Sequence, residues 1–179
     1  MKSRIAVSAM LAALVLVPPS PARAQTSATT VAAGYSYLRD LGGGATPSTD
    51  YATGWFVAVT RQVGFRRLGL VGELTGNSRT NEAIEVQRLT AFLGGVRVLL
   101  VNLSGLEMYT VALLGVERFS EPGFSETALA FQPGIGVDLP IWKALGARAQ
   151  ADYRMARKDD VTFKEVRVAA GATIRFGGP

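Results

Sequence analysis

The chain has 179 residues, no cysteine, no histidine and a formal net charge of +5. The absence of both residue types excludes disulfides, Ser-His and Cys-His catalytic arrangements, and metal sites built on thiolate or imidazole ligands. Three of the 19 basic residues and none of the 14 acids lie in the first 24 positions, so residues 25–179 carry a net charge of 16 minus 14, or +2. These residues also have no basic run interleaved with aromatics. Both observations argue against a nucleic-acid partner.

The first 24 residues have the pattern of a secretory signal peptide. Lys2 and Arg4 precede an uncharged apolar run, Ile5 to Val17, which prolines then interrupt. Ala22-Arg23-Ala24 matches the small-x-small motif that precedes a cleavage site. The run is about 13 residues long, whereas a membrane-spanning helix needs about 20. We therefore expect residues 1–24 to be removed and residues 25–179 to form the exported domain.

Residues 25–179 form a train of short β-like segments separated by turn-like stretches, without an apolar run long enough for a transmembrane helix. Each segment is about 10 to 13 residues long, close to the 9–11 of a tilted membrane-spanning strand and longer than the 5–6 usual in soluble sheets. The predicted strands cover 29–39, 52–62, 67–77, 87–98, 107–118, 128–138, 145–155 and 164–176. This pattern predicts an all-β fold, an eight-stranded antiparallel up-and-down transmembrane β-barrel.

The predicted strands alternate polar or small residues with apolar ones. In the last segment Glu165 and Arg167 begin a polar and small row, while Val166 and Val168 begin an apolar row. Side chains alternate between the two faces of a strand. We expect the apolar rows to face lipid, because the polar rows mix Gly, Gln, Asp and Arg with little Lys, which suits a narrow eight-stranded lumen. The predicted lipid-facing residues are Leu70, Ile135, Tyr153, Val166, Val168 and Ile174, and Gln132 is among those predicted to face the lumen.

The predicted lumen rows carry charges of both signs. Buried charges must be paired, so these residues are candidates for a charge network inside the barrel: Glu73, Asp138, Arg148, Asp152, Arg154, Arg167 and Arg175. Asp152 and Arg167 are expected at similar depth on neighbouring strands. A structural plug is the favoured interpretation, because eight strands leave room for side chains rather than a channel. The alternative is a narrow gated pore for small solutes.

Aromatics and connections also favour a membrane barrel. Aromatic residues near segment ends suit the interfacial girdles of membrane proteins: Tyr35, Tyr37, Trp55, Tyr109, Trp142, Tyr153 and Phe176. With the N-terminus in the periplasm, the outer connections are 40–51, 78–86, 119–127 and 156–163, and the periplasmic ones 63–66, 99–106 and 139–144. The outer connections are longer on average, as in outer-membrane barrels. Pro133 lies awkwardly within a predicted strand.

The most specific motif is at the C-terminus. Gly171, Ile174 and Phe176 fit the spacing of the insertion signal polar-x-Gly-x-x-apolar-x-aromatic, with Ala169 at the polar position. With this motif and strand-like segments such as Gly54–Val59, residues 25–179 resemble the small outer-membrane barrels of the OmpA-like and OmpX-like families. The resemblance implies insertion into outer-membrane lipid by the barrel-assembly machinery, and an unidentified extracellular partner at the loops.

The residues contain no catalytic arrangement that we can identify. The adjacent acids Asp159 and Asp160 lie in a predicted loop tip, where solvation explains them. The sequence therefore predicts no enzyme, no metal and no cofactor, but a non-enzymatic outer-membrane protein with a structural or surface-interaction role. The alternative is a soluble periplasmic or secreted lipocalin-like barrel that binds an apolar ligand. That alternative requires the apolar rows to face inward.

Overall fold

A computed structural model describes residues 28–42, 47–64, 67–80, 86–159 and 161–177, so the predicted signal peptide lies outside the described residues. The strands are β1 (Thr29–Asp40), β2 (Thr49–Tyr51), β3 (Thr53–Gln62), β4 (Leu68–Thr80), β5 (Val86–Leu103), β6 (Leu106–Glu121), β7 (Phe124–Trp142), β8 (Leu145–Lys158) and β9 (Val161–Phe176). Within these ranges no helix is long and apolar enough to cross a membrane.

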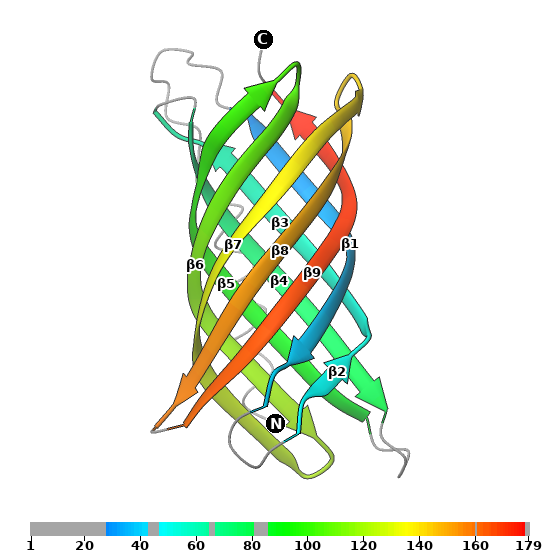
Figure 1. Cartoon of the computed structure of the whole chain (residues 1–179), viewed down its shortest axis with the longest axis vertical. Coiled ribbons are helices and arrows are strands. Elements are labelled where there is room, and N and C mark those ends of the chain that lie inside the picture. Colours follow the sequence, from blue (N-terminus) through cyan, green and yellow to red (C-terminus); the bar gives the residue numbers. More distant parts are fainter. Residues whose placement is uncertain (1–27, 43–46, 65–66, 81–85, 160, 178–179) are drawn as a thin grey trace, which may run out of the picture.

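The strands form one closed antiparallel barrel (Figure 1). Each long strand pairs with the next along the chain, and β1 pairs with β9 from Thr29↔Phe176 to Asp40↔Glu165. The short β2 adds to the end of β1 and leads into β3 after Ala52, so the wall has eight strands. The predicted eight-stranded up-and-down barrel is confirmed. We call the end holding Thr29 and Phe176 the inner end, and the opposite end the outer end, after the predicted orientation.

The cross-strand registers set the tilt of the strands. A path of direct partners leads around the barrel from Val31 through Val59, Gly72, Gly94, Leu114, Phe131 and Met155 to Lys164. The Lys164 carbonyl accepts a 2.8 Å hydrogen bond from the amide of Leu41. One circuit therefore returns to the first strand ten residues beyond its starting point, from position 31 to position 41. This stagger requires the strands to tilt against the barrel axis, as Figure 1 shows.

Several strands are longer than predicted. The hairpin of β5 and β6 is paired up to Leu103↔Leu106, and that of β8 and β9 up to Lys158↔Val161. The predicted loops 99–106, 119–127, 139–144 and 156–163 are therefore wrong in extent, because most of their residues are paired strand. Backbone groups pair whatever the side chains are, so a turn-like composition did not show where pairing stops. The remaining turns are tight and use positive φ at Ser104, Gly105, Gly123, Lys143 and Asp159.

The side chains face as the alternation predicts. The predicted lipid-facing residues are exposed or half-buried, with Ile135 at 64% exposure and Val168 at 51%. In contrast, Gln132 and Arg167 are 0% exposed. The apolar rows therefore form the outer surface, which is opposite to the facing that the lipocalin-like alternative requires.

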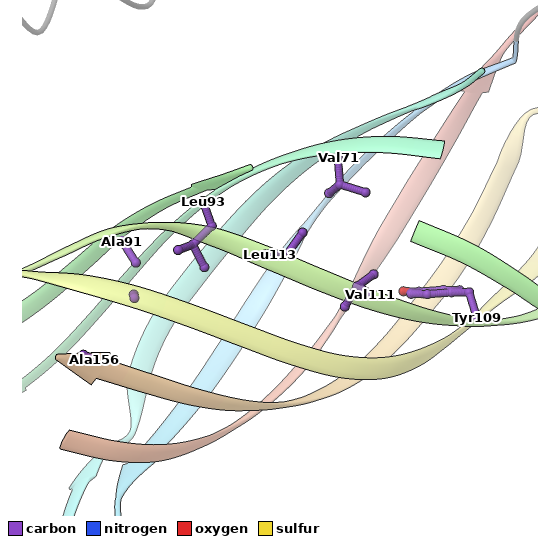
Figure 2. Packing of buried hydrophobic residues seen from close by; sticks show 8 residues of the cluster. Val71, Ala91, Leu93, Tyr109, Val111, Leu113 and Ala156 are labelled. Atoms are coloured by element: carbon purple, nitrogen blue, oxygen red, sulfur yellow. The ribbon is translucent and has the colours of Figure 1, made fainter. Parts of the chain in front are cut away.

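One predicted girdle residue is inside the barrel. Tyr109 is 1% exposed and belongs to a small apolar cluster within the lumen (Figure 2). Its place follows from its position on β6, since Glu107 and Val111 on the same row are also buried while Met108 is exposed. The prediction that Tyr109 lies in an interfacial girdle is wrong. The other cluster members are Val71, Ala91, Leu93, Val111, Leu113, Ala130 and Ala156.

Pro133 lies at an interruption in the sheet. The pairs between β7 and β8 stop at Phe131↔Met155 and resume at Gly134↔Asp152, so Gln132 and Pro133 have no assigned partner on that side. Proline has no N–H to donate to a ladder. The pairing of β7 with β6 is not interrupted, and there Pro133 lies opposite Ala112.

Candidate functional site: the charged lumen

The inward rows of β4 to β9 bring acids and arginines together inside the barrel. Ten charged residues in these rows are buried: Glu73, Arg97, Glu107, Glu117, Asp138, Arg148, Asp152, Arg154, Glu165 and Arg167. Arg175 lies at the inner end of the same row of β9, and its side chain is 42% exposed. Charges removed from water need partners to offset the loss of hydration. The contacts below form three groups along the lumen.

The inner group is built around Asp138 of β7. Its carboxylate accepts two hydrogen bonds from Arg148, at 2.7 and 2.8 Å, and one from Arg97 at 2.7 Å. Arg97 also pairs with Glu107 at 3.1 Å, and Glu107 pairs with Arg175 at 2.8 Å. Arg97 thus joins β5 to β6 and β7, and Arg148 joins β8 to β7.

The ring of Tyr109 packs against the two buried arginines of the inner group. The guanidinium carbon of Arg97 lies 3.7 Å from the ring centroid and that of Arg148 lies 5.4 Å from it. Arginine is attracted to the negative face of an aromatic ring, most strongly where water is excluded. The Tyr109 hydroxyl donates to Gln150 Oε1 at 3.0 Å, which connects this group to the next.

The middle group holds Arg167, the most deeply buried cation. Its Nε and Nη2 atoms lie 2.8 and 2.6 Å from Asp152 Oδ2, and Nη2 lies 2.8 Å from Glu73 Oε1. Asp152 and Arg167 are direct cross-strand partners on β8 and β9. Two amides complete the group: Gln150 donates to Asp152 at 2.9 Å, and Gln132 donates to Glu73 at 2.9 Å.

The outer group is centred on Arg154 of β8. Its guanidinium lies 2.6 Å from Glu117 and 3.6 Å from Glu165, and it donates to Thr75 Oγ1 at 3.2 Å. Its Nε donates to Gln132 Oε1 at 2.8 Å. Gln132 thus joins the outer group to the middle one, as Gln150 joins the middle to the inner one. The result is one connected polar network, which we call the lumen network, running along most of the barrel.

The structure places six of the seven predicted site residues within the lumen network, and Arg175 at its inner mouth. Sequence reasoning missed three charged members, Arg97, Glu107 and Glu117, and it placed Glu165 in the polar row of the last segment without predicting its pair with Arg154. Each lies on the inward row of its strand, so counting in steps of two from a neighbouring lumen residue would have found it.

The residues of the predicted insertion signal lie in β9. Gly171 is opposite Gly34 of β1, and a Cβ atom on Gly171 would lie 2.2 Å from the carbonyl oxygen of Ala33. This close approach explains a glycine at that position. Ile174 and Phe176 are exposed on the outer surface near the inner end. Their role in insertion remains a prediction.

The lumen offers fixed charge pairs and little open space. A small hollow at the inner mouth is lined by residues that include Thr30, Thr60, Arg97 and Glu107. In the described part of the chain no three or more His, Cys, Asp or Glu side chains are grouped to hold a metal ion. The carboxylates contact arginines and amides, and these side chains occupy the lumen.

Comparison with known proteins identifies the fold. No protein-family profile and no curated protein matches the sequence. Among solved structures, Ail of Yersinia pestis superposes with a TM-score of 0.56 at 19% identity, covering 85% of this chain and 100% of Ail. Neisserial surface protein A gives 0.66 at 13% identity, covering 84% and 97%. The N-terminal barrel domain of Pseudomonas aeruginosa OprF gives 0.53 at 14% identity, covering 85% and 98%.

These structures are small outer-membrane barrels of eight strands. The chain shares their fold, and the predicted resemblance to this group of proteins is confirmed.

Proposed function

We propose that the protein is an exported, non-enzymatic β-barrel of the bacterial outer membrane, with residues 1–24 removed and with a structural or surface-interaction role. The observation that supports the proposal is the direction in which the alternating rows of side chains face. Large apolar side chains such as Leu114, Leu129 and Ile135 are exposed around the wall, while ten charged residues are buried inside. Exposing so large an apolar surface to water is unfavourable, whereas exposing it to the hydrocarbon of a membrane is not.

The lumen network supports a plug rather than a pore. Its three groups are connected, and arginines from β5, β8 and β9 reach carboxylates on neighbouring and opposite strands. Eight strands enclose a space that side chains can fill. A conducting path would require these buried pairs to separate, and separating a buried pair is unfavourable by several kcal/mol, roughly 3–5 when a partner is lost.

The outer end supports the surface-interaction role. β1 and β4 end there, β2 and β5 begin there, and the hairpins β6–β7 and β8–β9 also turn at that end. Ail has been solved in complex with the heparin analogue sucrose octasulfate. We propose the outer end of this chain as the surface that meets an extracellular partner, and the surrounding wall as the surface that meets lipid.

Cell fractionation tests the location. The mature protein should remain in the outer-membrane fraction, dissolve only in detergent, and migrate differently in electrophoresis before and after heating, as folded barrels do. Recovery as a detergent-free monomer from the periplasm would overturn the proposal.

Planar-bilayer recordings separate the plug from the gated pore. The wild type and Asp152→Ala should both lack a steady conductance. A large conductance in Asp152→Ala, with unchanged stability, would replace the plug with a gate.

A further inference from the structure

Five basic side chains project from the outside of the barrel near its outer end: Arg39 of β1, Arg88 of β5, Arg118 of β6, Arg157 of β8 and Lys164 of β9. All five are exposed, and each adjoins a buried lumen residue in the sequence. Arg118 follows Glu117, and Lys164 precedes Glu165. Because neighbouring side chains alternate between faces, the five face outward. We call them the basic belt.

The registers bring three members of the basic belt side by side. Arg157 of β8 lies directly opposite Thr162 of β9, and Lys164 is two residues closer to the inner end. Lys164 in turn lies opposite Leu41, and Arg39 is again two residues closer to the inner end. Such diagonal neighbours on adjacent strands are about 7–8 Å apart, within reach of long side chains.

The other two members continue the basic belt at the same level. Arg118 of β6 is two residues closer to the inner end than the residue that faces Arg88. Across β7, Arg118 lies opposite Thr127 and Arg157 opposite Leu129, again two residues closer to the inner end. Because the barrel has a stagger of ten residues over eight strands, a path that stays at one height must shift by about one residue towards the inner end at each step to the next strand. The five cations, on five of the eight wall strands, therefore lie at one height around the barrel, to within about two residues, instead of following the tilted strands.

The basic belt lies immediately outside the apolar part of the wall. Moving inward on the same face of each strand, an aromatic residue is the first one met after Arg39 (Tyr37) and the second one met after Arg88 (Phe92) and Arg157 (Tyr153). Aromatic rings mark the interface between hydrocarbon and headgroups. A cation one or two outward positions beyond such a ring is at the height of lipid phosphates.

The basic belt carries little compensating charge among the described residues. There, Asp50 is the one acid that pairs with a belt member, at 3.6 Å from Arg39, and both side chains are 51% exposed. Arg118 donates to Ser125 Oγ at 3.1 Å and Arg157 to the carbonyl of Asp159 at 3.3 Å. The acids within these strands face the lumen instead, and exposed Asp159 lies in the turn beyond Arg157, so the described outward face at this height is net positive.

We propose that the basic belt binds the phosphate groups of phosphorylated lipids in the outer leaflet around the barrel. This inference rests on the proposed membrane location. Four of the five side chains are arginines, whose planar guanidinium matches phosphate oxygens in two parallel hydrogen bonds. A level ring suits ligands that lie side by side in one leaflet, whereas a soluble anion would need no common height.

Two matched triple variants test the proposal. R88Q/R118Q/R157Q removes three charges from the basic belt, and R61Q/R67Q/K143Q removes three exposed charges towards the inner end. Both variants and the wild type are folded in non-ionic detergent and checked by heat-modifiable mobility. Binding of diphosphorylated lipid A is then measured by native mass spectrometry, with the dephosphorylated lipid as a second ligand and inorganic phosphate as a competitor.

The belt variant should bind the phosphorylated lipid on the order of 100-fold more weakly, because each cation near an anionic surface contributes about a factor of five. The inner-end variant should bind like the wild type, and added salt should weaken wild-type binding. Equal binding by both variants, equal binding of the dephosphorylated lipid, or displacement by a few millimolar inorganic phosphate would each overturn the proposal. A wild type that does not fold as a barrel in detergent would instead contradict the proposed function.

Discussion

Arg167 shows how a single side chain is held in the lumen. It is 0% exposed and pairs with Asp152 on the adjacent strand and with Glu73 on β4 across the barrel. Hydrogen bonds to charged partners are the strong ones, and an unpaired buried charge is correspondingly unfavourable. The stability of the barrel should therefore depend on such pairs more than on any exposed pair.

Asp152→Ala should lower the free energy of unfolding by about 3 kcal/mol, the low end of the usual range, because Glu73 still pairs with Arg167. Denaturant unfolding in detergent, followed by tryptophan fluorescence, measures the change. Asp50→Ala is the control, since its pair with Arg39 is exposed and contributes about 0–1 kcal/mol. Equal effects of the two substitutions would contradict a bracing role for the lumen network.

Gly136 leaves the space that the Tyr109 ring occupies. A Cβ atom at Gly136 would lie 2.5 Å from the ring and its hydroxyl. The ring cannot move freely, because it bonds to Gln150 and lies against Arg97. Gly136→Ala should therefore destabilise the barrel by about 1–3 kcal/mol, as overpacking does.

The matched control for that substitution is Gly72→Ala. A Cβ atom there meets nothing within 4 Å. Alanine restricts the unfolded chain more than glycine does, so this variant should be neutral or about 0.5–1 kcal/mol more stable. The same unfolding assay compares the two, and a stabilising Gly136→Ala would show that Tyr109 can move aside.

At the scale of a strand, the sequence predicts which side chains face the lumen, but it does not predict where the strand ends. The rows through Arg167 and Val168 predicted the facing of β9, because one buried face imposes a period of two. The ends of β5 to β8 were missed, since backbone pairing continues through polar and turn-forming residues. Alternation also places Tyr109 in the lumen, because it lies on the same row as buried Glu107 and Val111.

The predicted facing of β9 can be tested with two neighbouring alanines. Ala169 is 1% exposed and faces the lumen, and Ala170 is exposed on the wall. The chain has no cysteine, so A169C and A170C each introduce one thiol. In lipid vesicles, a maleimide confined to hydrocarbon should label A170C rapidly and A169C hardly at all. Faster labelling of A169C would show that the row of Ala169, and not the row of Ala170, faces lipid.

At the scale of the whole molecule, the barrel could be predicted and the full network could not. Strand number and facing follow from local patterns, but contacts such as Arg154 with Thr75 join strands β8 and β4 across the lumen. The ten-residue stagger decides which inward residues meet, and no single segment encodes it. The pair Asp152 and Arg167 was predictable because both lie in one hairpin.

The predicted signal peptide gives a whole-chain test. N-terminal sequencing of the protein from outer membranes should begin at or near Gln25, because Ala22 and Ala24 offer small side chains to the peptidase. Ala24→Leu should block cleavage and retain the leader. Membrane-bound wild type that still begins with Met1 would contradict the prediction.

The seam between β1 and β9 has a consequence for how the barrel folds. The long strands otherwise pair with their neighbours along the chain, so hairpins can form locally, whereas the seam joins Thr29 to Phe176. Closing so long a loop is entropically the most demanding step, and contacts this distant in sequence slow folding. Until the seam forms, two strand edges have unpaired backbone groups, which hydrocarbon does not tolerate. A chain shortened before β9 would therefore aggregate as an open sheet instead of forming a smaller barrel, and insertion and closure become a single event.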